Sequence, residues 1–175
     1  LKLIQALFMT LKQDWIKETW NYIEYATIGT IADVMPLTGE NRAICWFGLY
    51  KMRNCPNKLF QLFREQLQLK YIDSTNIGFL IGPMLNSCGR ISDPNIGAAI
   101  LQKATPTAED VQLLMNLNNK RKQLTNKQFK LAAEIIEQQS LEKDSLLVVQ
   151  GDFHKGIIGI LASKISSHYK RPTIV

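Results

Sequence analysis

One acidic residue of the chain stands where its carboxylate could bind a metal ion. Asp33 lies between an apolar stretch that ends at Ala32 and a polar loop that begins at Pro36. A carboxylate at the rim of a core has to be paired, hydrogen-bonded or bound to metal, because burying it bare is too costly. A lone aspartate in such a place is more often a helix cap. The residues therefore leave two interpretations of Asp33 open, a metal ligand and a cap.

Metal-dependent hydrolysis of a phosphodiester would require more ligands than Asp33 provides. Two divalent ions held roughly 3.5–4 Å apart need several carboxylates or histidines around them. The other acidic residues form no D-x-D or D-H-H cluster. If Asp33 binds metal, we expect its partner ligands to lie upstream of this sequence.

A second group of polar residues falls within residues 82–91, which read G-P-M-L-N-S-C-G-R-I. The planar guanidinium of Arg90 suits a phosphate, and Asn86 can donate to a phosphate or hold a loop in place. The alternative is a structural loop held by an ion pair between Arg90 and Asp93. The residue types do not choose between these two interpretations.

A third group precedes a predicted helix near the end of the chain. Residues 151–156 read as a glycine-containing turn, and backbone N–H groups at the start of a helix attract anions. His154 can hydrogen-bond a phosphate or carry a proton. The alternative is a structural histidine that caps the turn.

Together these runs resemble three motifs of one family. Residues 28–42 resemble G-T-[IV]-A-D-V-x-P-L-x-G-E-N-R, the last metal-binding motif of the RecJ exonucleases of the DHH phosphoesterase superfamily. Residues 82–91 resemble the G-P-x-[LI]-N-A-x-G-R-[LIM] element of that family, with Ser87 and Cys88 where small residues such as alanine are usual. Residues 154–164 resemble the start of the DHH-associated domain, and the three motifs occur in the family's order.

The resemblance implies an α/β architecture in three parts. Residues 1–105 would be the mostly helical end of the DHH catalytic domain. Residues 106–143 would form a long connecting helix, and residues 144–175 the start of the α/β DHH-associated domain.

The resemblance also implies an activity. The whole protein would be a cytoplasmic 5′→3′ exonuclease that hydrolyses phosphodiester bonds of single-stranded DNA in repair and recombination. It would use Mn²⁺ or Mg²⁺ in a two-metal site, with a helicase or a single-strand-binding protein as candidate partner. Asp33 would be the catalytic metal ligand, and the substrate-binding residues would be Asn86, Arg90, His154 and Gly156.

We expect this sequence to be a piece of that enzyme, because it starts within a helical pattern and ends within a strand. We expect the piece to be inactive or nearly so, because most of the metal ligands are missing from it. One alternative is a DHH-family phosphodiesterase acting on oligonucleotides or cyclic dinucleotides, which usually lacks the run at residues 37–42. Another is a non-catalytic, helical DNA-binding module.

The spacing of apolar residues predicts the elements that carry these motifs. We expect a loop over residues 86–93, followed by a helix that begins at Pro94. A helix of about 30 residues, which would bridge two domains, should follow Pro106. The other predictions are helices near residues 1–12, 18–31, 44–52 and 57–69, a helix capped by Ser74, and a β-α-β unit with strands at 146–149 and 173–175 and a helix over 157–169.

Composition sets weaker bounds. Twenty-one basic and fifteen acidic residues give a net charge of +6, which suits a polyanion. Three widely spaced cysteines form no zinc pattern, and no apolar run is long enough to predict a membrane span. We expect Trp15, Trp20 and Trp46 to lie in the core, with no alternation of aromatic and basic residues.

Residues 118–121 match an N-x-x-R pattern of RecJ-like chains. We interpret them as a solvated helix face or as a clamp between domains.

Overall fold

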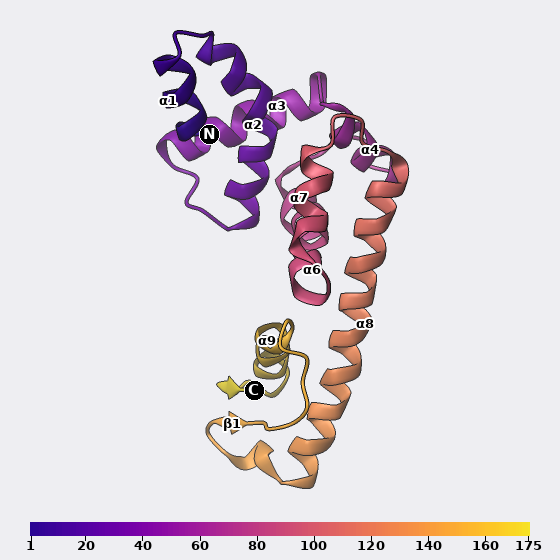
Figure 1. Cartoon of the computed structure of the whole chain (residues 1–175). Coiled ribbons are helices and arrows are strands. Elements are labelled where there is room, and N and C mark those ends of the chain that lie inside the picture. Colours follow the sequence, from indigo (N-terminus) through magenta and orange to yellow (C-terminus); the bar gives the residue numbers. More distant parts are fainter. The chain divides into compact units, whose positions relative to one another are not determined.

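Helices make up most of the chain, and the single sheet has two short parallel strands (Figure 1). The computed structural model describes residues 1–175. The predicted mostly helical α/β architecture is confirmed at this level. The helices are α1 (Lys2–Thr10), α2 (Trp15–Ala32), α3 (Gly39–Asn54), α4 (Lys58–Gln66), α5 (Ser74–Asn76), the π-helix η1 (Ile77–Ile81), α6 (Gly82–Ile91), α7 (Pro94–Gln102), α8 (Ala108–Gln138), the 3₁₀-helix η2 (Leu141–Lys143) and α9 (Ile158–Tyr169), and the strands are β1 (Leu147–Val148) and β2 (Thr173–Ile174).

The chain divides into two compact units that interleave along the sequence. Unit 1 contains residues 1–85 and 100–112, and unit 2 contains residues 86–99 and 113–175. The assignment of residues 1–105, 106–143 and 144–175 to a catalytic domain, a connecting helix and an associated domain stays a prediction. No helix is both long enough and apolar enough to cross a membrane.

In unit 1, α2 packs closely against α3. A Cβ at Gly48 of α3 would lie 1.8 Å from the hydroxyl oxygen of Thr27 of α2, so only glycine allows this approach. The Thr27 hydroxyl lies 2.8 Å from the carbonyl oxygen of Ile23 and 3.0 Å from that of Ile44, within hydrogen-bonding distance of both. The tight crossing thereby also satisfies a buried polar group.

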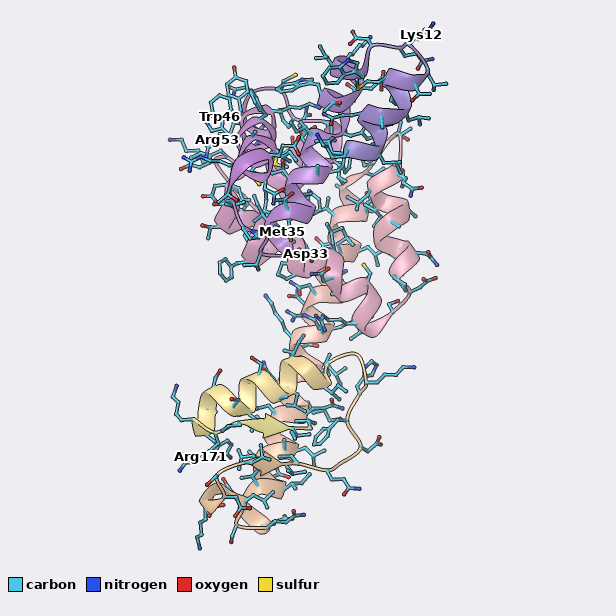
Figure 2. All side chains as sticks on the ribbon, turned by 90° about the vertical axis from the view of Figure 1, so that its left-hand side faces the viewer. Lys12, Asp33, Met35, Trp46, Arg53 and Arg171 are labelled. Carbon is cyan, nitrogen blue, oxygen red and sulfur yellow. The ribbon has the colours of Figure 1, made fainter.

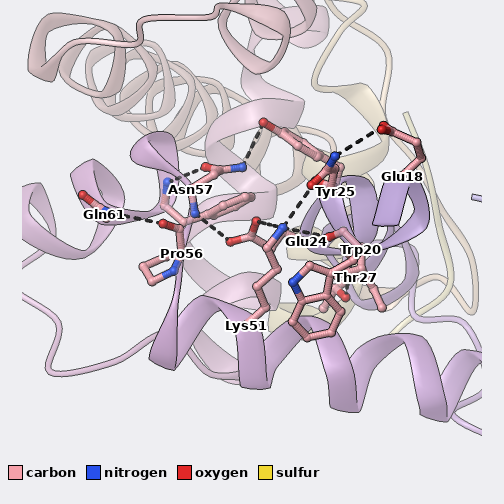
Figure 3. A network of polar contacts seen from close by, with 12 residues as sticks. Glu18, Trp20, Glu24, Tyr25, Thr27, Lys51, Pro56, Asn57 and Gln61 are labelled. Atoms are coloured by element: carbon pink, nitrogen blue, oxygen red, sulfur yellow. Dashed lines mark hydrogen bonds and ion pairs between the residues drawn. The ribbon is translucent and has the colours of Figure 1, made fainter. Parts of the chain in front are cut away.

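A buried ion pair ties together three elements of this unit (Figure 3). Lys51 Nζ of α3 lies 3.0 Å from Glu24 Oε2 of α2 and also donates to the carbonyl oxygen of Trp20 at 2.7 Å. Asn57, which caps α4, donates its backbone N–H to Glu24 Oε1 at 3.1 Å and its side-chain amide to the Tyr25 hydroxyl at 3.0 Å. Burial raises the pKa of Glu24, and the hydrogen bond from Lys51 opposes that shift.

In unit 2, a β-α-β unit packs on the C-terminal half of α8. β1 and β2 pair in parallel, with Leu147 opposite Thr173 and Val148 opposite Ile174, and α9 connects them. This confirms the predicted strand–helix–strand order. The buried core joins α8, β1 and α9 through the apolar residues Ala132, Ile136, Leu147, Val149, Leu161 and Ile165.

Two local predictions are wrong. Residues 86–91 belong to helix α6 rather than to a loop. The π-helix η1 directly precedes α6, and its wider turn accommodates Pro83, whose ring would clash with a carbonyl of a regular helix. The cap of α5 is Asp73 rather than Ser74, because Asp73 Oδ1 accepts from the backbone N–H of Asn76 at 2.7 Å.

The tryptophans also differ from the prediction that they lie in the core. Trp46 is 61% exposed, and Trp15 and Trp20 are each 37% exposed. The core of unit 1 is built instead from other large apolar side chains, among them Met52, Phe60, Phe63, Ile77 and Ile81. Helical spacing places a residue on a face, but the neighbouring elements decide whether that face is covered.

Candidate functional site

Asp33 is the C-cap residue that directly follows α2, and its side chain is exposed (Figure 2). The backbone closes the helix with two hydrogen bonds, from Val34 N to the carbonyl oxygen of Ile31 and from Met35 N to that of Thr30, both 3.1 Å. This pattern usually places glycine where Val34 stands, because Val34 adopts a φ of 54°. A β-branched residue is strained in this left-handed conformation, so the turn beside Asp33 costs the folded chain conformational free energy.

The position of Asp33 is unfavourable for a carboxylate unless a cation binds there. The C-terminal end of a helix carries partial negative charge, and an aspartate adds to it. The helix cap at Asp33 is made by its backbone, and none of the ion pairs of the chain involves its side chain. No group of three or more acidic, histidine or cysteine side chains could hold a metal in this chain. Asp33 thus fits a metal site as a single ligand.

In unit 2, the structure brings together three of the predicted substrate-binding residues. Arg90, in the last turn of α6, donates from Nη1 to the carbonyl oxygen of Gly156 at 3.3 Å. The N–H of Gly156 donates to His154 Nδ1 at 3.1 Å, and the N–H of His154 donates to Gln128 Oε1 at 3.1 Å. Because Nδ1 accepts, the neutral His154 ring carries its proton on Nε2. Asn86 is exposed on α6, one turn before Arg90.

A second guanidinium lies near Arg90. Arg121 of α8 is half-buried, and its Nε donates to Asn118 Oδ1 at 3.2 Å. Burial lowers the pKa of Arg121, and the positive charge of Arg90 lowers it further. An anion bound to both side chains would relieve this repulsion. The prediction of a solvated helix face is wrong for this pair, because Asn118 is buried.

Lys164 adds a third cation from another helix. Its Nζ, on α9, donates to Asn126 Oδ1 of α8 at 2.6 Å and lies 4.8 Å from the centre of the Phe129 ring. An open depression beside it is lined by Arg90, Gly159, Ile160, Ser163, Lys164 and Ser167. A neighbouring depression is lined by Arg121, Lys122, Thr125 and Asn126. We call Arg90, Arg121, Lys122 and Lys164 the cationic surface of unit 2.

The cationic surface lacks acidic partners. The three ion pairs of the chain join Lys2 to Glu40, Lys51 to Glu24 and Lys103 to Asp110. The alternative ion pair between Arg90 and Asp93 is not formed, because Asp93 instead accepts from the N–H of Asn95 at the start of α7. Arginines and lysines that lie together without carboxylate partners are suited to a phosphate.

Sequence reasoning missed Arg121 and Lys164 as members of this group. One signal was available for Arg121, because residues 111–133 contain five basic residues and no acidic residue. A helix of that composition cannot neutralise its own cations by pairs three or four residues apart. Lys164 offered no such signal, since only tertiary packing brings α9 against α8.

Gly156 and Gly159 provide a matched pair of alanine variants. A Cβ at Gly156 would lie 1.8 Å from the carbonyl oxygen of Arg90, whereas a Cβ at Gly159 would meet nothing within 4 Å. Gly156→Ala should therefore push the turn away from α6 and destabilise unit 2 by roughly 1–3 kcal/mol. Gly159→Ala should leave its stability nearly unchanged. Urea unfolding followed by circular dichroism would test this, and equal behaviour of the two variants would contradict it.

Comparisons with known proteins agree with the motifs. No protein-family model matches the chain. It is 33% identical over 160 residues to the single-stranded-DNA-specific exonuclease RecJ of Bacillus subtilis, covering 87% of this chain and 20% of that protein. It is 29% identical over 163 residues to the RecJ exonuclease of Escherichia coli, covering 87% of this chain and 28% of that protein. The chain thus spans between a fifth and somewhat more than a quarter of these relatives.

Solved structures give the same result. The chain matches the crystal structure of RecJ in complex with Mn²⁺ from Thermus thermophilus with a TM-score of 0.80 and 27% identity, covering 96% of this chain and 25% of that one. The Mg²⁺ complex from the same source matches with a TM-score of 0.78. The resemblance of this chain to part of a RecJ single-stranded-DNA-specific exonuclease, predicted from its three motifs, is therefore confirmed.

Proposed function

We propose that this chain is part of a metal-dependent 5′→3′ exonuclease that hydrolyses phosphodiester bonds of single-stranded DNA in repair and recombination. The observation that carries the proposal is the cationic surface of unit 2, where three helices bring together cations without acidic partners. Such a surface suits a phosphate backbone. The similarity to RecJ exonucleases supports single-stranded DNA as the polyanion. We further propose that the enzyme acts in the cytoplasm.

Asp33 is the proposed catalytic ligand for Mn²⁺ or Mg²⁺. Both ions prefer carboxylate oxygens, and the similar RecJ structures are complexes with these two metals. A two-metal site, when filled, would activate the attacking water and neutralise the phosphate. Since this chain offers one ligand, the others would come from parts of the enzyme outside this sequence. The chain by itself should then be inactive.

The remaining proposed residues hold the strand. Arg90 and Arg121 can share one phosphate, and an anion there would also offset their mutual repulsion. His154 can donate from Nε2, because Nδ1 is occupied by the N–H of Gly156. Gly156 keeps the turn close to Arg90, and Asn86 extends the same side of α6 by one turn. Binding of this kind weakens strongly with salt.

The domain roles follow the same proposal. Residues 1–105 would complete the DHH catalytic domain, residues 106–143 would connect it, and residues 144–175 would begin the DHH-associated domain. The enzyme would act on strands that a helicase exposes or a single-strand-binding protein covers.

A substrate panel with the full-length protein, meaning a protein of RecJ length that contains this sequence, would test the proposal. We expect Mn²⁺-dependent, stepwise shortening of 5′-phosphorylated single strands from the 5′ end, little attack on duplex, and no reaction with a chelator. Activity confined to dinucleotides would instead indicate a small-substrate phosphodiesterase. Binding without hydrolysis of any substrate would indicate a non-catalytic DNA-binding module.

A further inference from the structure

One face of α3 exposes aromatic rings and arginines together. Arg42, Trp46, Tyr50 and Arg53 follow one another at intervals of four, four and three residues, which places them on one side of the helix. Trp46 is 61% exposed and Tyr50 is 52% exposed, and Phe47 beside them is 45% exposed. In Figure 2, Trp46 and Arg53 lie on the same side of unit 1. We call these five residues the aromatic face of α3.

The rings of this face hold one another in fixed orientations. Trp46 and Tyr50 are stacked, with ring centres 5.9 Å apart and planes 11° apart. Phe47 meets Trp46 edge-on, with ring centres 4.8 Å apart, and also contacts Trp20 of α2 edge-on at 6.4 Å. Two nearly parallel, stacked rings are therefore exposed to solvent on one helix, and little freedom would be lost when a planar ligand adds to the stack.

The cations of this face are unpaired with carboxylates. Neither Arg42 nor Arg53 belongs to any of the three ion pairs of the chain. The guanidinium of Arg53 instead lies over the ring of Tyr71 at 4.8 Å, which continues the alternation of rings and cations beyond α3. An anionic ligand with planar groups would complement both features, whereas an apolar protein surface would leave the arginines buried without partners.

We propose that the aromatic face of α3 is a binding surface for single-stranded DNA, on which bases stack against Trp46 and Tyr50 while Arg42 and Arg53 contact phosphates. Single-strand binders combine these two elements, since every base has a planar face and stacking tolerates any sequence. This inference rests on the proposed function for its ligand, and it adds a base-contacting surface in unit 1 to the phosphate-contacting surface of unit 2. The linear sequence hides the alternation because the residues meet only through the helical repeat.

The test uses the 175-residue chain, a fluorescent oligothymidylate of about 20 nucleotides and an abasic strand of the same length. Trp46→Ala should weaken binding of the oligothymidylate roughly five- to a hundredfold, as expected for the loss of one stacking ring. The same variant should bind the abasic strand as tightly as the wild type does. Phe79→Ala is the control, because Phe79 also carries an aromatic ring, is 78% exposed and lies outside this face. It should leave both affinities unchanged.

Three results would overturn the inference. They are equal affinities of Trp46→Ala and Phe79→Ala, a wild type that binds abasic and base-bearing strands alike, and a wild type that binds neither. A dimer that Trp46→Ala dissociates while DNA binding persists would assign the face to a second copy of the chain and also overturn it. Failure to bind either strand would also count against the cationic surface of unit 2, whereas the other results concern the aromatic face of α3 alone. The full-length substrate panel tests the nuclease proposal independently.

Discussion

Asp33→Asn in the full-length protein is expected to remove nearly all Mn²⁺-dependent hydrolysis of single-stranded DNA while leaving the fold intact. Loss of an outer partner of a metal ligand typically costs 10- to 100-fold, and loss of the ligand itself should cost roughly a hundredfold or more. The free energy of unfolding should increase rather than decrease. Removing a negative charge from the C-terminal end of α2 should stabilise the helix by about 0.3–1 kcal/mol. Steady-state rates and urea unfolding would measure the two effects.

Asp14→Asn at the opposite end of the same helix is the matched control. The Asp14 carboxylate accepts from the backbone N–H of Lys17 at 3.1 Å, and asparagine caps helices about equally well. This variant also removes one negative charge, but from the N-terminal end of α2, where the helix dipole favours it. The free energy of unfolding should therefore fall slightly, and the activity should not change. If the Asp33→Asn enzyme is fully active, Asp33 is a helix cap and not a metal ligand. A variant that is inactive because it is unfolded would contradict the expected stability gain.

Lys51→Met is expected to destabilise unit 1 by about 3–5 kcal/mol, because it leaves a buried carboxylate without its counter-ion. The side chain of Glu24 is fully buried, and the Lys51 ammonium is the only partner of its Oε2 oxygen. Lys103→Met breaks an exposed pair with Asp110 and should cost less than about 1 kcal/mol. All three tryptophans lie in unit 1, so tryptophan fluorescence during urea unfolding reports this unit directly.

The loss in Lys51→Met should depend on pH. The pKa of Glu24 is raised in the folded chain by burial, so between its unfolded and folded values the folded chain binds more protons than the unfolded chain does. Stability therefore falls as pH rises through that window, and removal of Lys51 extends the window upward. The stability of Lys51→Met should thus be closer to that of the wild type at acidic pH than at neutral pH. Adding Glu24→Gln should restore most of the stability, and a pH-independent loss would contradict this account.

Much of the local structure was readable from the chain. The interval of apolar residues predicted the long helix, which is α8 with 31 residues, and the switch to a continuous apolar run predicted β1 and the β-α-β unit. These features depend on neighbours a few residues apart, which is the range over which helix and strand periodicity act. Asp33 was likewise recognised as the candidate metal ligand from the residues next to it in the sequence.

Local signals misled where a neighbouring element changes the outcome. Glycine, proline and polar residues predicted a loop at 86–93, yet the π-helix before Pro83 lets the helical path continue to Ile91. Trp46 has the spacing of a core residue, but no element covers that side of α3 in this chain. Propensity describes what a segment can adopt, and packing selects among those options.

The three RecJ-like motifs, the candidate residues within them and most of the helices and strands could be predicted from the sequence, because each depends on residues close together in the chain. Which of those residues meet could be learned from the packing of the helices alone. Arg90, Arg121 and Lys164 come from three helices, and no local spacing predicts that their charges share one surface without a carboxylate. The electrostatic character of a site depends on every charge that packing brings near, and a linear pattern does not contain that information.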